Sequence, residues 1–163
     1  MEIFGYSRRV LVALVLVSGA VVATAAQAQT SGKARIVVFR PDSPGGALGR
    51  GWPVKVDGQD IGSVQAGSYA VAERAPGPHT LSLEMFDFPG VSKHSVSVAA
   101  GQTAYFQVRL KPKSQQSLQG ATSFGVIGWA VGSSNAAKAE PNGLFEFVPA
   151  AAGAISGLRK TGN

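Results

Sequence analysis

The chain has 163 residues, of which 15 are lysine or arginine and nine are aspartate or glutamate, so its formal net charge is +6. It contains no cysteine, which excludes disulfides, zinc–thiolate sites, cysteine nucleophiles and a cysteine-linked lipid anchor. Charged residues make up only 15% and glycines number 21, which indicates one compact β-rich domain. The basic residues are scattered without interleaved aromatics, so we expect a solvated basic surface and no nucleic-acid partner.

The first 28 residues contain the three parts of a secretory signal peptide in order. Arg8 and Arg9 are the positive part, residues 10–22 are apolar, and a small-x-small cleavage site ends at Ala28. We expect cleavage before Gln29, leaving residues 29–33 as a short tail. The apolar part is shorter than the roughly 20 residues that span a bilayer, so an uncleaved anchor is the weaker alternative. The signal predicts a periplasmic or extracellular protein of a Gram-negative bacterium.

Residues 34–110 show the pattern of short antiparallel strands separated by glycine and proline turns. The first strand, 34–40, is apolar on both faces, which predicts a central strand covered on both sides. Asp57-Gly58 is the strongest turn signal, because a type I′ hairpin turn needs positive φ at both of its central positions. Pro76-Gly77 predicts a second tight turn, after which alternation begins at His79. The remaining expected strands cover residues 53–56, 59–64, 68–72, 79–85, 93–98 and 103–110.

Three surfaces are candidates for binding. The glycine-rich loop 42–52 lacks the Gly-Lys-Ser/Thr of a phosphate cradle, so we interpret it as a flexible loop that carries Trp52. Phe86 and Phe88 lie at an expected hairpin tip, where they either form a ligand platform or fold back over the end of the sandwich. Tyr105 and Arg109 point outward from the strand 103–110.

The sequence shows no constellation for catalysis, and we expect neither a metal nor a cofactor. His79 and His94 are the only histidines, and they lack the close ligand spacing of a zinc site. We expect His79 to hydrogen-bond a backbone carbonyl and His94 to be half-buried. No Gly-x-Ser-x-Gly nucleophile motif occurs. The prediction is therefore that the protein is not an enzyme.

The C-terminal third is less regular. Residues 111–143 form a Gly/Ser/Ala-rich connecting segment in which we expect 114–120 to be loose. Its apolar stretch 124–132 either covers the core or touches a membrane surface, and it is too short to span one. We expect residues 144–163 to supply a last strand and then a short helix after Pro149, both packed on the sandwich.

Several motifs recur in an order that resembles a family of small bacterial secreted proteins, often lipoproteins, known only as a domain of unknown function. The Asp-Gly hairpin and the Pro-Gly-x-His strand are also similar, more distantly, to PEGA domains. The resemblance implies no catalytic residues. Members of the first family often carry a lipobox cysteine after the signal. This chain has none, and its absence favours a soluble periplasmic protein. The motifs are Phe39-Arg40-Pro41, Val56-Asp57-Gly58-x-x-Ile61-Gly62, Gly67-Ser68-Tyr69, Pro76-Gly77-x-His79-Thr80-Leu81 and Ala100-Gly101-Gln102-Thr103-Ala104-Tyr105.

Together these patterns predict an all-β fold, a single antiparallel β-sandwich of immunoglobulin-like or PEGA-like type with about seven strands and a short C-terminal helix. The leading functional hypothesis is a non-catalytic binding or structural module of the cell envelope, whose partner is an envelope protein or a glycan. The first alternative is a membrane-associated protein held by residues 124–132 or by an uncleaved signal. The second is a small hydrolase of unrecognised type.

Overall fold

The computed structural model describes residues 32–42, 50–86, 88–122, 132, 134–136, 140 and 142–161. The expected signal peptide, with its cleavage site at Ala28 and Gln29, lies outside these residues. So do residues 43–49 of the glycine-rich loop and nearly all of the apolar stretch 124–132.

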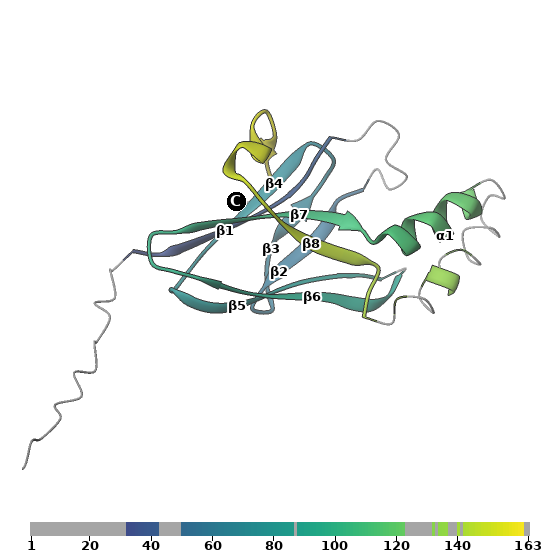
Figure 1. Ribbon diagram of the computed structural model, residues 1–163, viewed down its shortest axis with the longest axis horizontal. Coiled ribbons are helices and arrows are strands. Elements are labelled where there is room, and N and C mark those ends of the chain that lie inside the picture. Colours follow the sequence, from purple (N-terminus) through teal and green to yellow (C-terminus); the bar gives the residue numbers. More distant parts are fainter. Residues whose placement is uncertain are drawn as a thin grey trace, which may run out of the picture.

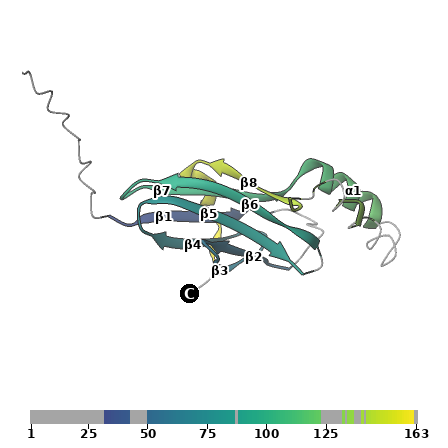
Figure 2. The same ribbon diagram turned by 90° about the horizontal axis from the view of Figure 1, so that it is seen from below.

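The described chain folds into two facing sheets, so the predicted β-sandwich is confirmed (Figures 1 and 2). One sheet has five strands in the order β8-β7-β1-β4-β9, and the other has four in the order β3-β2-β5-β6. The bounds are β1 (Ala34–Arg40), β2 (Trp52–Val56), β3 (Gln59–Val64), β4 (Ser68–Arg74), β5 (Gly77–Met85), β6 (Phe88–Val98), β7 (Thr103–Leu110), β8 (Phe145–Ala150) and β9 (Arg159–Lys160).

The five-stranded sheet is not wholly antiparallel, which corrects the sequence prediction. β1 lies parallel to β7, and β4 lies parallel to β9. β1 and β7 run in the same direction because the chain leaves the sheet after β4, builds the β5–β6 pair in the other sheet, and returns. The sequence pattern did not indicate the two-residue strand β9 either, since so short a segment shows no alternation.

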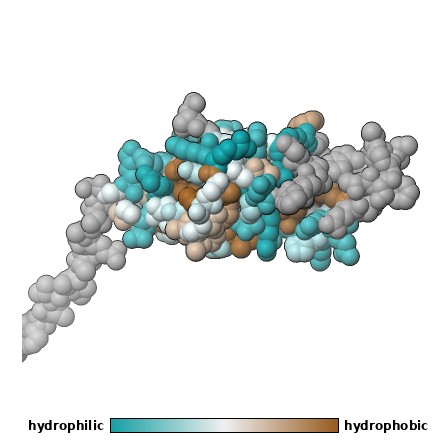
Figure 3. All heavy atoms as spheres, turned by 90° about the horizontal axis from the view of Figure 1, so that it is seen from above, coloured by the Kyte–Doolittle hydropathy of each residue, from teal (hydrophilic) through white to brown (hydrophobic). Residues whose placement is uncertain are grey.

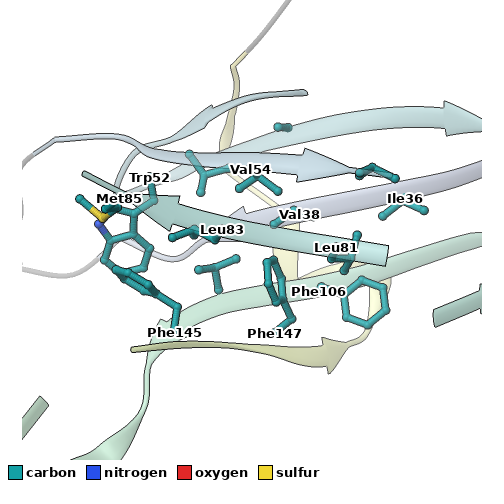
Figure 4. Packing of buried hydrophobic residues seen from close by; sticks show 14 of the residues in the cluster. Ile36, Val38, Trp52, Val54, Leu81, Leu83, Met85, Phe106, Phe145 and Phe147 are labelled. Carbon is teal, nitrogen blue, oxygen red and sulfur yellow. The ribbon is translucent and has the colours of Figure 1, made fainter. Parts of the chain in front are cut away.

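The core lies between the sheets, and β1 is buried on both sides as predicted. Ile36 and Val38 belong to the central cluster, while Val37 and Phe39 on the opposite face are only 2% and 1% exposed. Figure 4 shows how the central cluster draws on both sheets. The members labelled there are Ile36, Val38, Trp52, Val54, Leu81, Leu83, Met85, Phe106, Phe145 and Phe147.

The predicted Asp57-Gly58 hairpin is confirmed. Val56 pairs with Gln59 across a two-residue turn, and the φ angles of Asp57 and Gly58 are 54° and 78°. Both are positive, as a type I′ turn requires. This turn positions Asp57 beside the start of β5.

The segment expected to be loose after residue 111 is instead the helix α1 (Pro112–Thr122). Pro112 occupies the first helical position, where its missing N–H costs nothing. Ser114 and Leu118, one turn apart, are 0% and 3% exposed, and Leu118 belongs to the central cluster, so burial of this face outweighs the polar composition.

The short helix expected after Pro149 is present, but it is a 3₁₀ helix and begins later than expected. β8 continues through Pro149, which pairs with Phe106, and only the single 3₁₀ turn η1 (Ala152–Ile155) follows. β8 is the edge strand of its sheet, where a residue without an N–H is tolerated. Gly157, with φ 80°, then turns the chain toward β9.

Seen from above, the surface shows hydrophobic residues gathered in its middle and hydrophilic residues around them (Figure 3).

Gly143→Ala is expected to lower the stability strongly. A Cβ at Gly143, where φ is 84°, would collide with the backbone nitrogen and Oγ of Ser92 on β6. The same hydroxyl accepts a buried 2.9 Å hydrogen bond from the N–H of Phe145. We expect a loss of about 2 kcal/mol or more in the free energy of unfolding, measured by urea denaturation.

Gly58→Ala is the matched control, because φ there is 78° but a Cβ would meet nothing within 4 Å. It isolates the backbone penalty, about 1 kcal/mol. Equal losses of unfolding free energy in the two variants would contradict the close approach between Gly143 and Ser92 of β6.

Candidate functional site

The aromatic residues singled out in the sequence separate in the structure. Trp52, the first residue of β2, is 4% exposed, and its ring centroid lies 4.7 Å from that of Phe145. Phe88 is 3% exposed and meets Phe145 edge-on at 6.3 Å. Figure 4 shows Trp52 and Phe145 against each other beside Met85. The Trp52 and Phe88 rings therefore close the end of the core and are not presented to solvent.

Phe86 has the opposite environment, although it is only two residues from Phe88. Its side chain is 95% exposed at the tip between β5 and β6. The guanidinium of Arg50 lies 5.4 Å from the centroid of its ring, within the range of a cation–π contact. The sequence left two alternatives for these rings: they either fold back over the end of the sandwich or form a ligand platform. Phe88 has the buried position of the first alternative, and Phe86 has the exposed position of the second.

Beneath this pair lies a buried arginine that sequence reasoning missed. Arg40, at the end of β1, is 5% exposed, and its guanidinium lies 3.8 Å from the centroid of the Trp52 ring. Its Nη1 donates a 3.2 Å hydrogen bond to the carbonyl oxygen of Arg50. Burial lowers the pKa of Arg40 from its ordinary value. We call Arg40, Arg50, Trp52 and Phe86 the aromatic end of the sandwich.

Tyr105 and Arg109 are not part of the aromatic end. Both lie on β7, where Tyr105 is half-buried and aligned with Val37 of β1. Arg109 is paired with Glu146 of β8, with 2.7 Å between Nε and Oε1. Such an exposed cross-strand pair adds a few tenths to about 1 kcal/mol to the sheet.

The closest approach to catalytic chemistry is a hydrogen-bond network around Asp57 and His79. His79 Nδ1 lies 2.7 Å from Asp57 Oδ2, and His79 Nε2 lies 2.8 Å from the carbonyl oxygen of Ala75. The other carboxylate oxygen of Asp57 accepts a 2.9 Å hydrogen bond from the N–H of Thr80, and the Asp57 N–H donates to the Thr80 carbonyl at 2.8 Å. The predicted contact of His79 with a backbone carbonyl is confirmed.

This arrangement resembles the aspartate–histidine half of a hydrolytic triad, but its geometry is that of a structural link. In a triad the second imidazole nitrogen accepts a proton from a nucleophile. Here Nε2 faces the Ala75 carbonyl, and the His79 side chain is only 8% exposed. The ring therefore connects the β2–β3 turn to the turn that precedes β5.

The charge on Asp57 is stabilised by its neighbours. Burial raises the pKa of Asp57, but the hydrogen bonds from the Thr80 N–H and His79, with the charges of His79 and Arg74, hold it below its usual value. Arg74 Nε lies 3.9 Å from Asp57 Oδ2. The folded state thus favours the ionised carboxylate.

The other histidine packs against aromatic rings. His94, half-buried as predicted, lies 5.2 Å from the Phe106 ring and 6.3 Å from that of Phe147. Within the residues that the structure describes, no three histidine, aspartate or glutamate side chains group closely enough to hold a metal ion. No described helix has both the length and the apolar character to cross a bilayer.

A polar hollow of about 360 Å³ opens at the opposite end of the sandwich, near the start of β1. Lys33 and Arg35 on its wall both pair with Glu73, at 3.3 and 3.2 Å, and these hydrogen bonds, from Arg35 first and Lys33 second, lower the pKa of Glu73. The hollow is lined by Lys33, Arg35, Glu73, Gly101, Gln102 and Thr103. Its charged side chains are exposed to water and paired with one another. A ligand would therefore gain little binding energy by replacing these contacts.

Asp57→Asn is expected to remove part of the acid sensitivity of the fold. The folded pKa of Asp57 lies below its unfolded value, so the carboxylate stabilises the fold above pH ~4 and loses that effect as the pH falls through the folded pKa. The variant should be less stable at pH 7 by roughly 0.5–1 kcal/mol, a small figure because solvent screens a partly exposed group. Thermal unfolding as a function of pH measures the difference.

The control is Asp60→Asn on the next strand. The amide oxygen of this variant can still accept the hydrogen bond that Gly62 N–H gives to Asp60 Oδ1. Its stability at pH 7 should therefore stay close to that of the wild type. A difference between wild type and Asp57→Asn that is constant from pH 3 to pH 7 would contradict the charge-based account of Asp57.

A family model described as "Protein of unknown function (DUF2846)" matches residues 30–121. The comparison with curated proteins finds no match. The matched residues include β1 to β7, and with them both Asp57 and His79. Because the match covers more than half of the chain, this protein belongs to the DUF2846 family, whose function is unknown.

Proposed function

We propose that this chain is an exported, non-catalytic module of the bacterial cell envelope that binds another envelope component, a protein or a glycan, through its aromatic end. One observation carries the proposal. Phe86 is the one large apolar side chain that the described part of the chain leaves exposed, at 95%. Aromatic residues and arginine dominate the binding energy of protein interfaces, and here Phe86 and Arg50 stand together.

The support under Phe86 and Arg50 favours a contact surface that is formed before binding. The Arg50 carbonyl accepts a hydrogen bond from Arg40, and Arg40 stacks on Trp52. Trp52 in turn packs on Phe145 in the core. A surface held in place by the core loses little conformational entropy when a partner binds.

Two further features support the rest of the proposal. The signal-like N-terminal sequence favours export, and the resemblance of the turn motifs to those of small secreted bacterial proteins favours an envelope origin. Both ring nitrogens of His79 face acceptors within the fold, which favours a structural role for the Asp57–His79 pair over a catalytic one.

Export predicts that the chain made in a Gram-negative host appears in the periplasmic fraction and starts at Gln29, as read by N-terminal sequencing. Ala28→Arg should block processing, because signal peptidase requires a small residue before the cleaved bond. Thr30→Ser, two residues beyond that bond, should leave processing intact. Recovery of the wild-type chain in the cytoplasm at full length would contradict export.

Binding through the aromatic end predicts that Phe86→Ser loses partners that the wild type retains. Immobilised wild-type protein is exposed to periplasmic extract and, separately, to a glycan array. We expect the variant to bind a recovered partner at least about tenfold more weakly, since Phe86 would supply the central buried ring. Its stability should change by no more than about 0.5 kcal/mol, because the ring is exposed.

Lys55→Ala is the matched control for this experiment. Lys55 is an exposed residue on β2 outside the aromatic end, so its loss should leave partner binding unchanged. Equal binding of the wild type and Phe86→Ser would contradict the assignment, and so would a wild-type protein that retains neither a protein nor a glycan.

A further inference from the structure

The four outer strands of the two sheets differ in how well they are protected from pairing. β8 and β9 end one sheet, and β3 and β6 end the other. An outer strand exposes unpaired N–H and C=O groups, and proteins usually blunt such edges with prolines, bulges or short strands. β9 has only two residues, and β8 contains Pro149. β3 pairs with β2 through a register shift, and the Gly62 N–H is taken up by the Asp60 side chain.

β6 has none of these devices over its second half. From Ser92 to Val98 it pairs with β5 in unbroken register, without proline or bulge. Within the part of the chain that the structure describes, the contacts that cover this stretch lie at its beginning, where Phe145 N–H donates to Ser92 Oγ and Gly143 approaches the same residue. In Figure 1 β6 runs along the outside of the four-stranded sheet.

The contacts of Thr80 establish which backbone groups of β6 face outward. Thr80 directs both its N–H and its C=O at Asp57, so it faces the β2 side of β5. Its neighbours His79 and Leu81 must then face β6, where they lie opposite Val96 and His94. Because backbone groups alternate along a strand, the N–H and C=O groups that point away from the sheet are those of Lys93, Ser95 and Ser97.

We propose that two copies of this chain pair antiparallel along β6, about a two-fold axis at Ser95. Ser95 then lies opposite Ser95 of the second copy, and Lys93 lies opposite Ser97 of the second copy. All three residues direct their free backbone groups outward, so each of these pairs can exchange two backbone hydrogen bonds. This proposal does not depend on the aromatic end or on export.

A second copy fits this edge because the charges do not oppose each other. Lys93 is the only lysine, arginine, aspartate or glutamate between Ser92 and Val98. The two-fold arrangement places it opposite a serine and four residues from the other lysine, whereas a pairing centred on Lys93 would bring two like charges together. Between the hydrogen-bonded pairs, His94 would face Val96 of the second copy, both half-buried at the rim of the core. The two-fold arrangement at Ser95 therefore combines free backbone groups with compatible side chains.

The dimer should be weak, because a few strand residues bury little surface. Interfaces below about 1,200 Å² belong to transient complexes, so sedimentation equilibrium is carried to about 1 mM protein. We expect a monomer–dimer equilibrium for the wild type. A monomer throughout that range would overturn the proposal.

Two substitutions at one exposed site test the register with opposite signs. Ser97→Glu would place a carboxylate opposite Lys93 of the second copy, and Ser97→Lys would place a like charge there. Since each dimer contains the contact twice, we expect the glutamate variant to dimerise roughly 2- to 30-fold more tightly and the lysine variant to be weaker by a similar factor. The difference should shrink in about 1 M salt, where the Debye length is about 3 Å. A shift of both variants in the same direction would overturn the two-fold register.

The backbone itself is tested by Ser95→Pro. Proline removes an N–H that faces solvent in the monomer, and so it should leave the fold intact while abolishing dimerisation. Ser95→Ala keeps the N–H and should dimerise like the wild type. Undiminished dimerisation of a folded Ser95→Pro variant would exclude β6 as the interface. Phe86→Ser should dimerise normally, so failure of this proposal can be told apart from failure of the binding function.

Discussion

The arrangement of the four-stranded sheet depends on the hydrogen bonds between Asp57 and the first residues of β5. A two-residue hairpin turn alone defines only the pairing of β2 with β3. Asp57 also connects the turn to β5. Its carboxylate accepts a hydrogen bond from the Thr80 N–H, and its own N–H donates to the Thr80 carbonyl. The His79 ring forms a third hydrogen bond, with the other carboxylate oxygen of Asp57. Asp57 can do this because the turn gives it a positive φ of 54°, which aspartate tolerates better than most residues. The link therefore needs the turn and the histidine together.

The link between Asp57 and Thr80 also bears on which backbone groups of β6, the outer strand of the sheet, are left unpaired. Once Thr80 faces Asp57, the alternation of backbone groups decides which residues of β5 meet β6, and hence which residues of β6 remain open. Pro78 is consistent with the same phase, because it has no N–H and lies opposite Ser97, a residue that does not bond to β5 in this arrangement. An interaction in one turn thus determines the hydrogen-bonding pattern at an edge two strands away.

The sequence predicted the sandwich well, because the strands are short, alternate regularly and are separated by turns with strong chemical preferences. It predicted the side-chain environments less well. Phe86 and Phe88 are two residues apart, which in a regular strand places them on one face. The register between β5 and β6 shifts between Leu83 and Met85, so regular alternation does not extend to the tip and the two rings separate. The helix α1 escaped prediction because its own sequence is polar and only weakly amphipathic, although the fold buries Ser114 and Leu118 on it.

Arg40 shows why the aromatic end could not be identified from residue types. An arginine at the end of a strand is usually solvated, as are Lys33 and Arg35 at the opposite end, where exposed cations share Glu73. Removing a guanidinium from water is costly unless aromatic and carbonyl groups replace the water, and at Arg40 the Trp52 ring and the Arg50 carbonyl do so. The fold thus buries the Arg40 guanidinium next to the backbone of Arg50, the residue whose side chain contacts Phe86. This asymmetry between the two ends is the physical reason for placing binding at the aromatic end and not at the polar hollow.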